Sequence, residues 1–152
     1  MHTIIYTSEA TPSMDSQKLD LNKICEAAVR NNNKNNITGV LLFHNNHFLQ
    51  VLEGNLGTIS SLVDKISADS RHSNLEIIYN NSLEKRNYPN WEMQLFDLSD
   101  SSKFSSATLK TIKEIYNHNF QFNSKEYLFL IESLLKDKAF LDSVNTPTYI
   151  KY

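Results

Sequence analysis

Apolar positions along the chain alternate between strand-like and helix-like spacing. Residues 3–8 (TIIYTS) combine β-branched and aromatic side chains, which favour a strand. A stripe of apolar residues at three- and four-residue spacing follows, and it predicts a helix that begins at Asp15 or Ser16 and ends near Asn31. The asparagine-rich run 31–36 predicts a turn, because Asn side chains compete for backbone hydrogen bonds.

A hairpin and a second helix are predicted next. Two apolar runs, 37–43 and 47–53, flank Asn45-Asn46, a pair that tolerates the positive φ angles of tight hairpin turns. After Gly54 the apolar residues return to helical spacing. This part of the chain is therefore predicted as strand, strand, helix.

Residues 75–81 and 91–98 are predicted as a fourth and a fifth strand, which gives the order β-α-β-β-α-β-β. This order, with its central hairpin, is typical of a ferredoxin-like α+β fold, in which right-handed crossovers place both helices on one face of the sheet. In the first strand Ile5 points opposite to Tyr6, so the second face also carries apolar side chains and needs a cover.

Two amphipathic segments near the end of the sequence, 103–118 and 124–142, are predicted as helices. We expect both helices to pack on the second face of the sheet. No Gly/Ser-rich or Pro-rich linker precedes them. Residues 1–98 are therefore predicted as the main domain, and residues 99–152 as a helical extension within the same compact unit.

The composition argues against a nucleic-acid-binding or membrane protein and is typical of a cytoplasmic one. The 152 residues carry a formal net charge of −2 without a long run of either sign, so neither nucleic acid nor an anionic membrane is predicted as a partner. Cys25 is the single cysteine, which suits a reducing cytosol. Every apolar run falls short of the ~18 residues that a membrane helix needs. We therefore expect a cytoplasmic protein.

The sequence lacks the signatures of common enzymes. Its three glycines form neither a phosphate-binding loop nor a dinucleotide fingerprint, and it contains no G-x-S-x-G or H-E-x-x-H motif. His44 and His47 flank the predicted hairpin turn without carboxylate or thiolate neighbours. Neither an enzyme nor a metal site is predicted.

Gln50 is notable because it lies inside an apolar stretch, FLQVL. Strand alternation turns it inward, as it does Tyr6 on the first strand and both Trp91 and Met93 on the fifth. A buried amide that lacks hydrogen-bond partners costs roughly 1–3 kcal/mol. This cost indicates a functional reason for Gln50.

A series of motifs is distributed over residues 1–98. They are Tyr6, Arg30-Asn31-Asn32, Ile37-Thr38-Gly39, the run Phe48-Leu49-Gln50-Val51-Leu52-Glu53-Gly54, Asp69-x-Arg71-His72 and Trp91-x-Met93. Their combination in this order is far more specific than any one of them, and it resembles the BLUF family (blue light using flavin), in particular its short, stand-alone type with C-terminal helices.

The resemblance implies a flavin, FAD or FMN, held noncovalently between the two crossover helices. Two isoleucines match the positions that sandwich the flavin ring, and two asparagines match those that address its carbonyl and N3–H edge. A lysine and an aspartate match contacts to its side chain or phosphate end, and a histidine is a further contact. The implied cofactor-binding residues are Ile24, Asn31, Asn32, Gln50, Lys65, Ile66, Asp69 and His72.

The same resemblance implies a blue-light photoreceptor. Tyr6 would give an electron and then a proton to the excited flavin, and recombination would leave Gln50 rotated or tautomerised. Trp91 and Met93 would relay the change to the C-terminal helices, and the output would be altered contact with an unidentified downstream protein or within a homo-oligomer. The choice of FAD or FMN, the oligomeric state, the dark-recovery rate and whether Trp91 or Met93 lies beside Gln50 in the dark all stay open.

Two positions differ from the pattern of the family. Ala28 stands where some members have a serine near the flavin, and Ser73 stands where many have a second histidine. The first difference removes a possible polar contact, and the second makes a histidine contact to the ring less certain. Neither affects Tyr6 or Gln50.

Other interpretations of these residues are open. Tyr6 could be a core aromatic, the asparagines could simply end a helix, and Lys65 and Asp69 could form a surface pair. An acylphosphatase-like hydrolase would use Arg30 and Asn32, although the glycine-poor loop after the first strand offers little to cradle a phosphate. A third alternative is a regulatory module without a cofactor.

Overall fold

The structure is a computed structural model, and it describes residues 1–11, 17–98, 102, 104–117 and 124–138. These residues fall into two compact units, one within Met1–Phe96 and one within Asp97–Thr146. The helix start predicted at Asp15 or Ser16 lies outside the described residues, as does Leu141 at the end of the last predicted helix.

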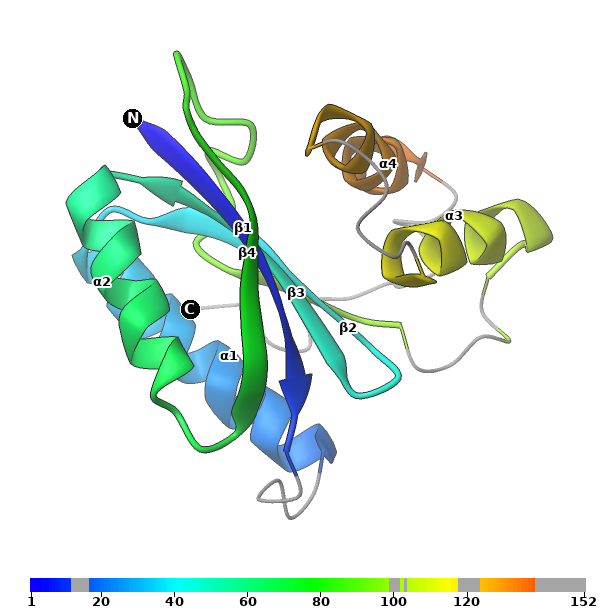
Figure 1. Cartoon of the computed structure of the whole chain (residues 1–152), viewed down its shortest axis with the longest axis horizontal. Coiled ribbons are helices and arrows are strands. Elements are labelled where there is room, and N and C mark those ends of the chain that lie inside the picture. Colours follow the sequence, from blue (N-terminus) through cyan, green and yellow to red (C-terminus); the bar gives the residue numbers. More distant parts are fainter. Residues whose placement is uncertain (12–16, 99–101, 103, 118–123, 139–152) are drawn as a thin grey trace. The chain divides into compact units, whose positions relative to one another are not determined.

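A five-stranded sheet forms the first unit, with the strand order β4-β1-β3-β2-β5 (Figure 1). The strands are β1 (His2–Ala10), β2 (Thr38–His44), β3 (His47–Gly54), β4 (His72–Ser82) and β5 (Gln94–Asp97). Strand β1 pairs antiparallel with both β3 and β4, so β1 and β3 are central. Asn45 and Asn46 have φ angles of 47° and 62°, as expected for the tight turn between β2 and β3.

Two helices, α1 (Gln17–Lys34) and α2 (Leu56–Ser67), cover one face of this sheet (Figure 1). Helix α2 begins where the Asn55 side chain accepts a hydrogen bond from the Thr58 backbone N–H. Apolar side chains of both helices pack with the inward side chains of the strands, and Cys25 is fully buried among them. The predicted α+β, ferredoxin-like architecture is confirmed.

The prediction of a turn at residues 31–36 is wrong, because α1 continues to Lys34. Asn36 has a φ of 53°, which places an asparagine in the left-handed position where helices commonly carry glycine. The Ile37 backbone N–H then donates to the Asn32 carbonyl (2.9 Å), and that of Asn36 donates to the Asn33 carbonyl (3.3 Å). This pattern is a Schellman motif, so the asparagines end the helix one turn later than predicted.

The last two strands also differ from the prediction. Strand β4 begins at His72 instead of residue 75, and β5 contains only Gln94–Asp97 instead of 91–98. Trp91 and Met93 therefore precede the strand, and the alternation used to place them on one face does not extend to them.

The second unit contains α3 (Ser106–Asn117) and α4 (Ser124–Lys136), which pack against each other. Ser105 precedes α3, and its hydroxyl oxygen accepts a hydrogen bond from the Thr108 backbone N–H (3.2 Å). Their predicted packing on the second face of the sheet, as part of one compact unit with residues 1–98, stays a prediction. Among the described residues no helix is both long and apolar enough to span a bilayer.

Candidate functional site

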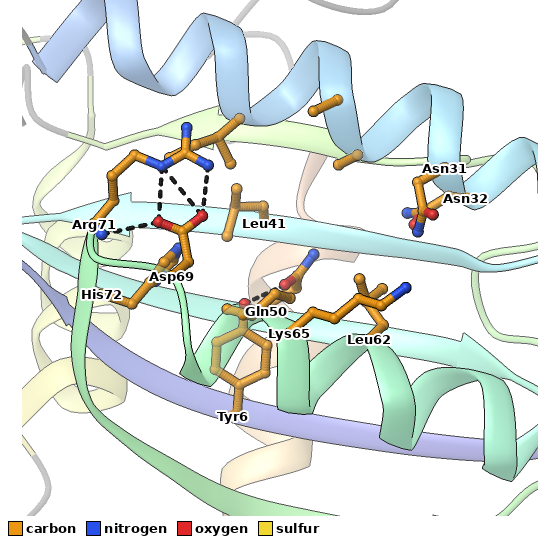
Figure 2. A pocket seen from close by; sticks show the side chains of 14 residues that line it. Tyr6, Asn31, Asn32, Leu41, Gln50, Leu62, Lys65, Asp69, Arg71 and His72 are labelled. Atoms are coloured by element: carbon orange, nitrogen blue, oxygen red, sulfur yellow. Dashed lines mark hydrogen bonds and ion pairs between the residues drawn. The ribbon is translucent and has the colours of Figure 1, made fainter.

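A cavity of about 220 Å³ lies between α1, α2 and the sheet. Figure 2 shows Asn31 and Asn32 at one end, Asp69, Arg71 and His72 at the other, and Gln50 between them. Every residue that the sequence predicted to bind a cofactor lines this cavity, as does Tyr6. The full lining is Tyr6, Ile24, Ala27, Ala28, Asn31, Asn32, Leu41, Gln50, Leu62, Lys65, Ile66, Asp69, Arg71 and His72.

The floor of the cavity is set by the pairing of the central strands. Tyr6 on β1 lies directly opposite Gln50 on β3, and the Tyr6 hydroxyl donates a hydrogen bond to Gln50 Oε1. The Gln50 Nε2 group donates to the sulfur of Met93 at 3.4 Å. Gln50 thus connects a phenol on one side with a thioether on the other, and one of its N–H groups remains for a molecule in the cavity.

Tyr6 is kept protonated by its surroundings. Complete burial raises the pKa of the Tyr6 phenol far above its usual value, and the nearby Asp69 carboxylate raises it further. A phenol that does not ionise at any ordinary pH retains its O–H as a hydrogen-bond donor. Its arrangement with Gln50 is therefore independent of pH in the physiological range.

The asparagine end of the cavity presents an unused acceptor. The Asn32 Nδ2 group donates to the Glu92 backbone carbonyl at 2.7 Å, which fixes the orientation of the side-chain amide. Its Oδ1 atom is buried and has no hydrogen-bond partner among the described residues. Because such an orphan acceptor costs free energy, it points to a donor group on a molecule that binds here.

The opposite end carries charge. Arg71 forms a bidentate pair with Asp69, with Nη2 at 2.6 Å from Oδ2, and hydrogen bonds from Arg71 lower the pKa of Asp69 to about 2. Burial lowers the pKa of His72, whose Nδ1 lies 2.9 Å from the Ser8 hydroxyl. Arg71 and His72 thus give this end hydrogen-bond donors for an anionic or polyhydroxyl group, whereas the Lys65 ammonium group on α2 points toward the asparagine end (Figure 2).

Trp91 and Met93 lie in different places. Met93 is fully buried in the core cluster and contacts Gln50, whereas Trp91 stacks on Tyr88 and meets Phe96 edge-on. Phe96 follows Leu95 along β5 and so points to the opposite face of the sheet. The prediction that Trp91 and Met93 share a face is wrong, since the extended strand that it assumed begins only at Gln94.

Several lining residues were not predicted from the sequence. Ala27, Leu41 and Leu62 add to the apolar walls, and Arg71 was noted as part of a motif without being assigned to the site. Strand pairing could have identified Leu41, because it lies directly opposite Gln50 in the hairpin. Arg30, which a hydrolase site would need, is exposed and does not line the cavity.

Comparison with known families decides what kind of protein has this site. The sequence profile of BLUF, described as sensors of blue-light using FAD, matches residues 1–94. The chain belongs to the BLUF family. BLUF domains sense blue light through a flavin, so the predicted family and its general function are confirmed.

Among curated relatives, the beta subunit of the photoactivated adenylate cyclase of Euglena gracilis is 38% identical over 87 residues, which are 57% of this BLUF chain and 10% of that protein. The blue light- and temperature-regulated antirepressor BluF of Escherichia coli is 31% identical over 96 residues, covering 63% of this chain and 23% of the relative. This chain thus spans a tenth to a quarter of the length of these relatives.

Solved structures support the same fold. The photo-activated state of BlsA superposes with a TM-score of 0.76 and 24% identity, covering 91% of this chain and 97% of that one. BlrP1 of Klebsiella pneumoniae, solved with FMN and cyclic diGMP, gives a TM-score of 0.65 and 28% identity over 88% of this chain and 34% of its own. The similarity to BlsA establishes the fold of this BLUF chain.

Proposed function

We propose that this chain binds FAD in the cavity between α1 and α2 and acts as a blue-light photoreceptor through Tyr6 and Gln50. The hydrogen bond from the Tyr6 hydroxyl to Gln50 Oε1, at the floor of the cavity, is the observation that carries the proposal. FAD is favoured over FMN because the description of the family names it, although BlrP1 was solved with FMN.

The residues present fit a flavin. Ile24 on α1 and Ile66 on α2 supply apolar surfaces on the two sides of a planar ring. The buried, unpartnered Asn32 Oδ1 suits the imide N–H of a flavin ring. Asn31 is the neighbouring residue in the lining, and its side-chain amide would donate to a carbonyl of the same ring. The second end of the cavity, with its hydrogen-bonding side chains, suits the flavin side chain and phosphates, which Asp69 and His72 would contact there, and Lys65 would reach the cofactor from α2.

When bound, the flavin supplies a ring that absorbs blue light and accepts an electron in its excited state. Tyr6 would give an electron and then its phenolic proton to the excited flavin, and both would return to Tyr6 on recombination. Gln50 changes its hydrogen bonds in between. Its amide has a donor end and an acceptor end, so rotation or tautomerisation exchanges donors and acceptors without backbone movement.

Met93 is the first residue to register this change, because its sulfur accepts the hydrogen bond from Gln50 Nε2. A rotated Gln50 presents its carbonyl oxygen to the sulfur instead, which removes this attraction. We propose that Met93 and Trp91 then pass the change to α3 and α4, and that contact with a downstream protein or within a homo-oligomer is altered. The chain has no catalytic activity in this proposal, and its place is the cytoplasm.

A purified sample with FAD supplied during expression tests the proposal. The protein should be yellow, and blue light should shift its absorption reversibly to longer wavelength as the flavin carbonyl gains a stronger hydrogen bond. Gln50→Leu should keep the flavin and lose this shift, whereas Gln94→Leu, the same change on a strand residue outside the cavity lining, should retain it. A colourless protein, or a normal photocycle in Gln50→Leu, would refute the proposal.

A further inference from the structure

Glu53 is a buried carboxylate at the end of β3 that takes no part in the proposed photochemistry. It belongs to the FLQVLEG motif and has no exposed surface. The backbone N–H of Asn87 donates to Oε1 at 3.1 Å and to Oε2 at 2.9 Å, the Asn87 side-chain amide donates to Oε1 at 2.9 Å, and the Tyr88 N–H donates to Oε2 at 3.0 Å. One carboxylate thus fixes two consecutive residues of the loop between β4 and β5.

Arg86 strengthens the same attachment. Its Nη1 group donates to the Glu53 carbonyl oxygen at 2.7 Å and to the Thr38 hydroxyl at 2.8 Å, and its Nη2 group donates to the Asn36 carbonyl at 2.6 Å. These acceptors lie at the end of β3, at the start of β2 and in the turn just before β2. We call the contacts made by Glu53 and Arg86 the loop clamp.

The loop clamp lies directly before Trp91 and Met93. Tyr88, whose N–H is held by Glu53, stacks on Trp91 with a centroid distance of 5.3 Å and an interplanar angle of 13°. The Trp91 backbone carbonyl in turn accepts a hydrogen bond from the Gly39 N–H at 2.7 Å. The position of Tyr88 therefore sets the position of the Trp91 ring against Phe96, away from the cavity.

This arrangement also decides which residue contacts Gln50. Trp91 and Met93 are two positions apart, and in the structure Met93 alone of the two contacts Gln50. This segment lies before β5, and its backbone is held by hydrogen bonds from the Gly39 N–H to the Trp91 carbonyl and from Asn32 Nδ2 to the Glu92 carbonyl. Displacement of Trp91 from Tyr88 would remove a further contact that holds the segment in place. Met93 would then be released from the place in which it meets the amide of Gln50.

We propose that Glu53 is a positioning residue which, through the loop clamp, holds Trp91 beside Phe96 and Met93 beside Gln50 in the dark. This inference rests on the proposed function, because it concerns the route by which the Gln50 change leaves the cavity. It assigns a role to Glu53 and Arg86 without placing either of them in contact with the cofactor.

The replacement Glu53→Gln tests the inference with almost no change in shape. An amide offers one acceptor oxygen in place of two and introduces an NH₂ group that opposes the N–H donors of Asn87 and Tyr88. Because charge-assisted hydrogen bonds are about twice as strong as neutral ones, we expect the population with a displaced Trp91 to rise roughly tenfold. Glu84→Gln, which removes the same charge from an exposed position in that loop, is the matched control.

Trp91 is the only tryptophan in the sequence, so tryptophan fluorescence reports on this residue alone. In Glu53→Gln with FAD bound, we expect the Trp91 emission spectrum in the dark to be altered. The difference in Trp91 emission between light and dark should be smaller than in the unmodified protein, while the reversible absorption shift of the flavin persists. Glu84→Gln should match the unmodified protein. An emission spectrum and a light response of Trp91 that are unchanged in Glu53→Gln would overturn the inference.

A second variant covers the case in which Glu53→Gln does not fold. Tyr88→Leu removes the aromatic stack and keeps the backbone N–H that Glu53 accepts, so it should alter Trp91 emission in the same direction. If Trp91 emission and its light response stay normal in Tyr88→Leu, the inference fails. Absence of the flavin shift in the unmodified protein would instead refute the proposed function, so the two failures are distinct.

Discussion

The hydrogen bond between Tyr6 and Gln50 predicts a large coupling free energy between these two side chains. Tyr6→Phe removes only the hydroxyl and leaves Gln50 Oε1 without its donor, while Gln50→Leu leaves the Tyr6 hydroxyl without its acceptor. Both residues are almost fully buried, with exposures of 1% and 4%, so water does not replace the lost partner. Each single replacement should therefore lower the free energy of unfolding by about 1–3 kcal/mol.

The double variant should lower the free energy of unfolding by less than the sum of the effects of the two single variants. With both polar groups gone, neither is left buried and unpaired, and the difference from additivity should be about 1–2 kcal/mol. The assay is urea unfolding of the flavin-loaded protein in the dark, followed by far-ultraviolet circular dichroism at a fixed excess of FAD, since ligand concentration shifts apparent stability. Both single variants should also lose the light-induced absorption shift.

A matched control uses a tyrosine on the same sheet. Tyr79 on β4 is only partly buried, and its hydroxyl lies 3.5 Å from Asn81 Nδ2, so Tyr79→Phe combined with Gln50→Leu should be additive. Additivity within about 0.5 kcal/mol for Tyr6→Phe with Gln50→Leu would mean that the hydrogen bond contributes nothing. The proposed arrangement of the photochemical pair would then be wrong.

Three further predictions concern the cavity wall, the relay and pH. Ala28→Leu should weaken FAD binding more than about tenfold in a flavin titration, because a branched side chain enters the cavity while the fold is kept; unchanged affinity would place the flavin elsewhere. Met93→Ala should keep the flavin absorption shift and lose the light-induced change of hydrogen exchange in α3 and α4; an intact change would exclude this route. Burial lowers the pKa of His72, so its contribution to stability is complete above the unfolded value of 6.5 and is lost as the pH falls below it. His72→Gln should therefore flatten the decline of unfolding free energy between about pH 7 and pH 5, and an unchanged decline would show that another group titrates there.

The sequence was sufficient for the parts of the fold that depend on local periodicity. The hairpin at Asn45-Asn46 and the helix after Asn55 follow from turn and cap chemistry, which acts within a few residues. The position of Gln50 on an inward face followed from alternation, because β3 is a regular central strand.

Features that depend on distant contacts were not predictable in this way. The asparagines after residue 30 were expected to break α1, but the Asn32 amide bonds to the Glu92 carbonyl, a partner 60 residues away. Trp91 and Met93 do not share a face because β5 begins only at Gln94, and the loop before it is hydrogen-bonded to Glu53, 34 residues before Asn87 in the sequence, which no periodicity in the sequence encodes.

The strand order predicts that local opening of the sheet requires much less free energy at its edge than at its centre. Tyr6 and Gln50 lie on β1 and β3, each of which is bonded on both sides, whereas β5 is short and joins the sheet at its edge beside β2. Amide hydrogens of the central strands should exchange only through global unfolding, while those of β5 should exchange through local opening of much lower free energy. A rearrangement at this edge can therefore occur and reverse many times without disturbing the central strands that carry Tyr6 and Gln50.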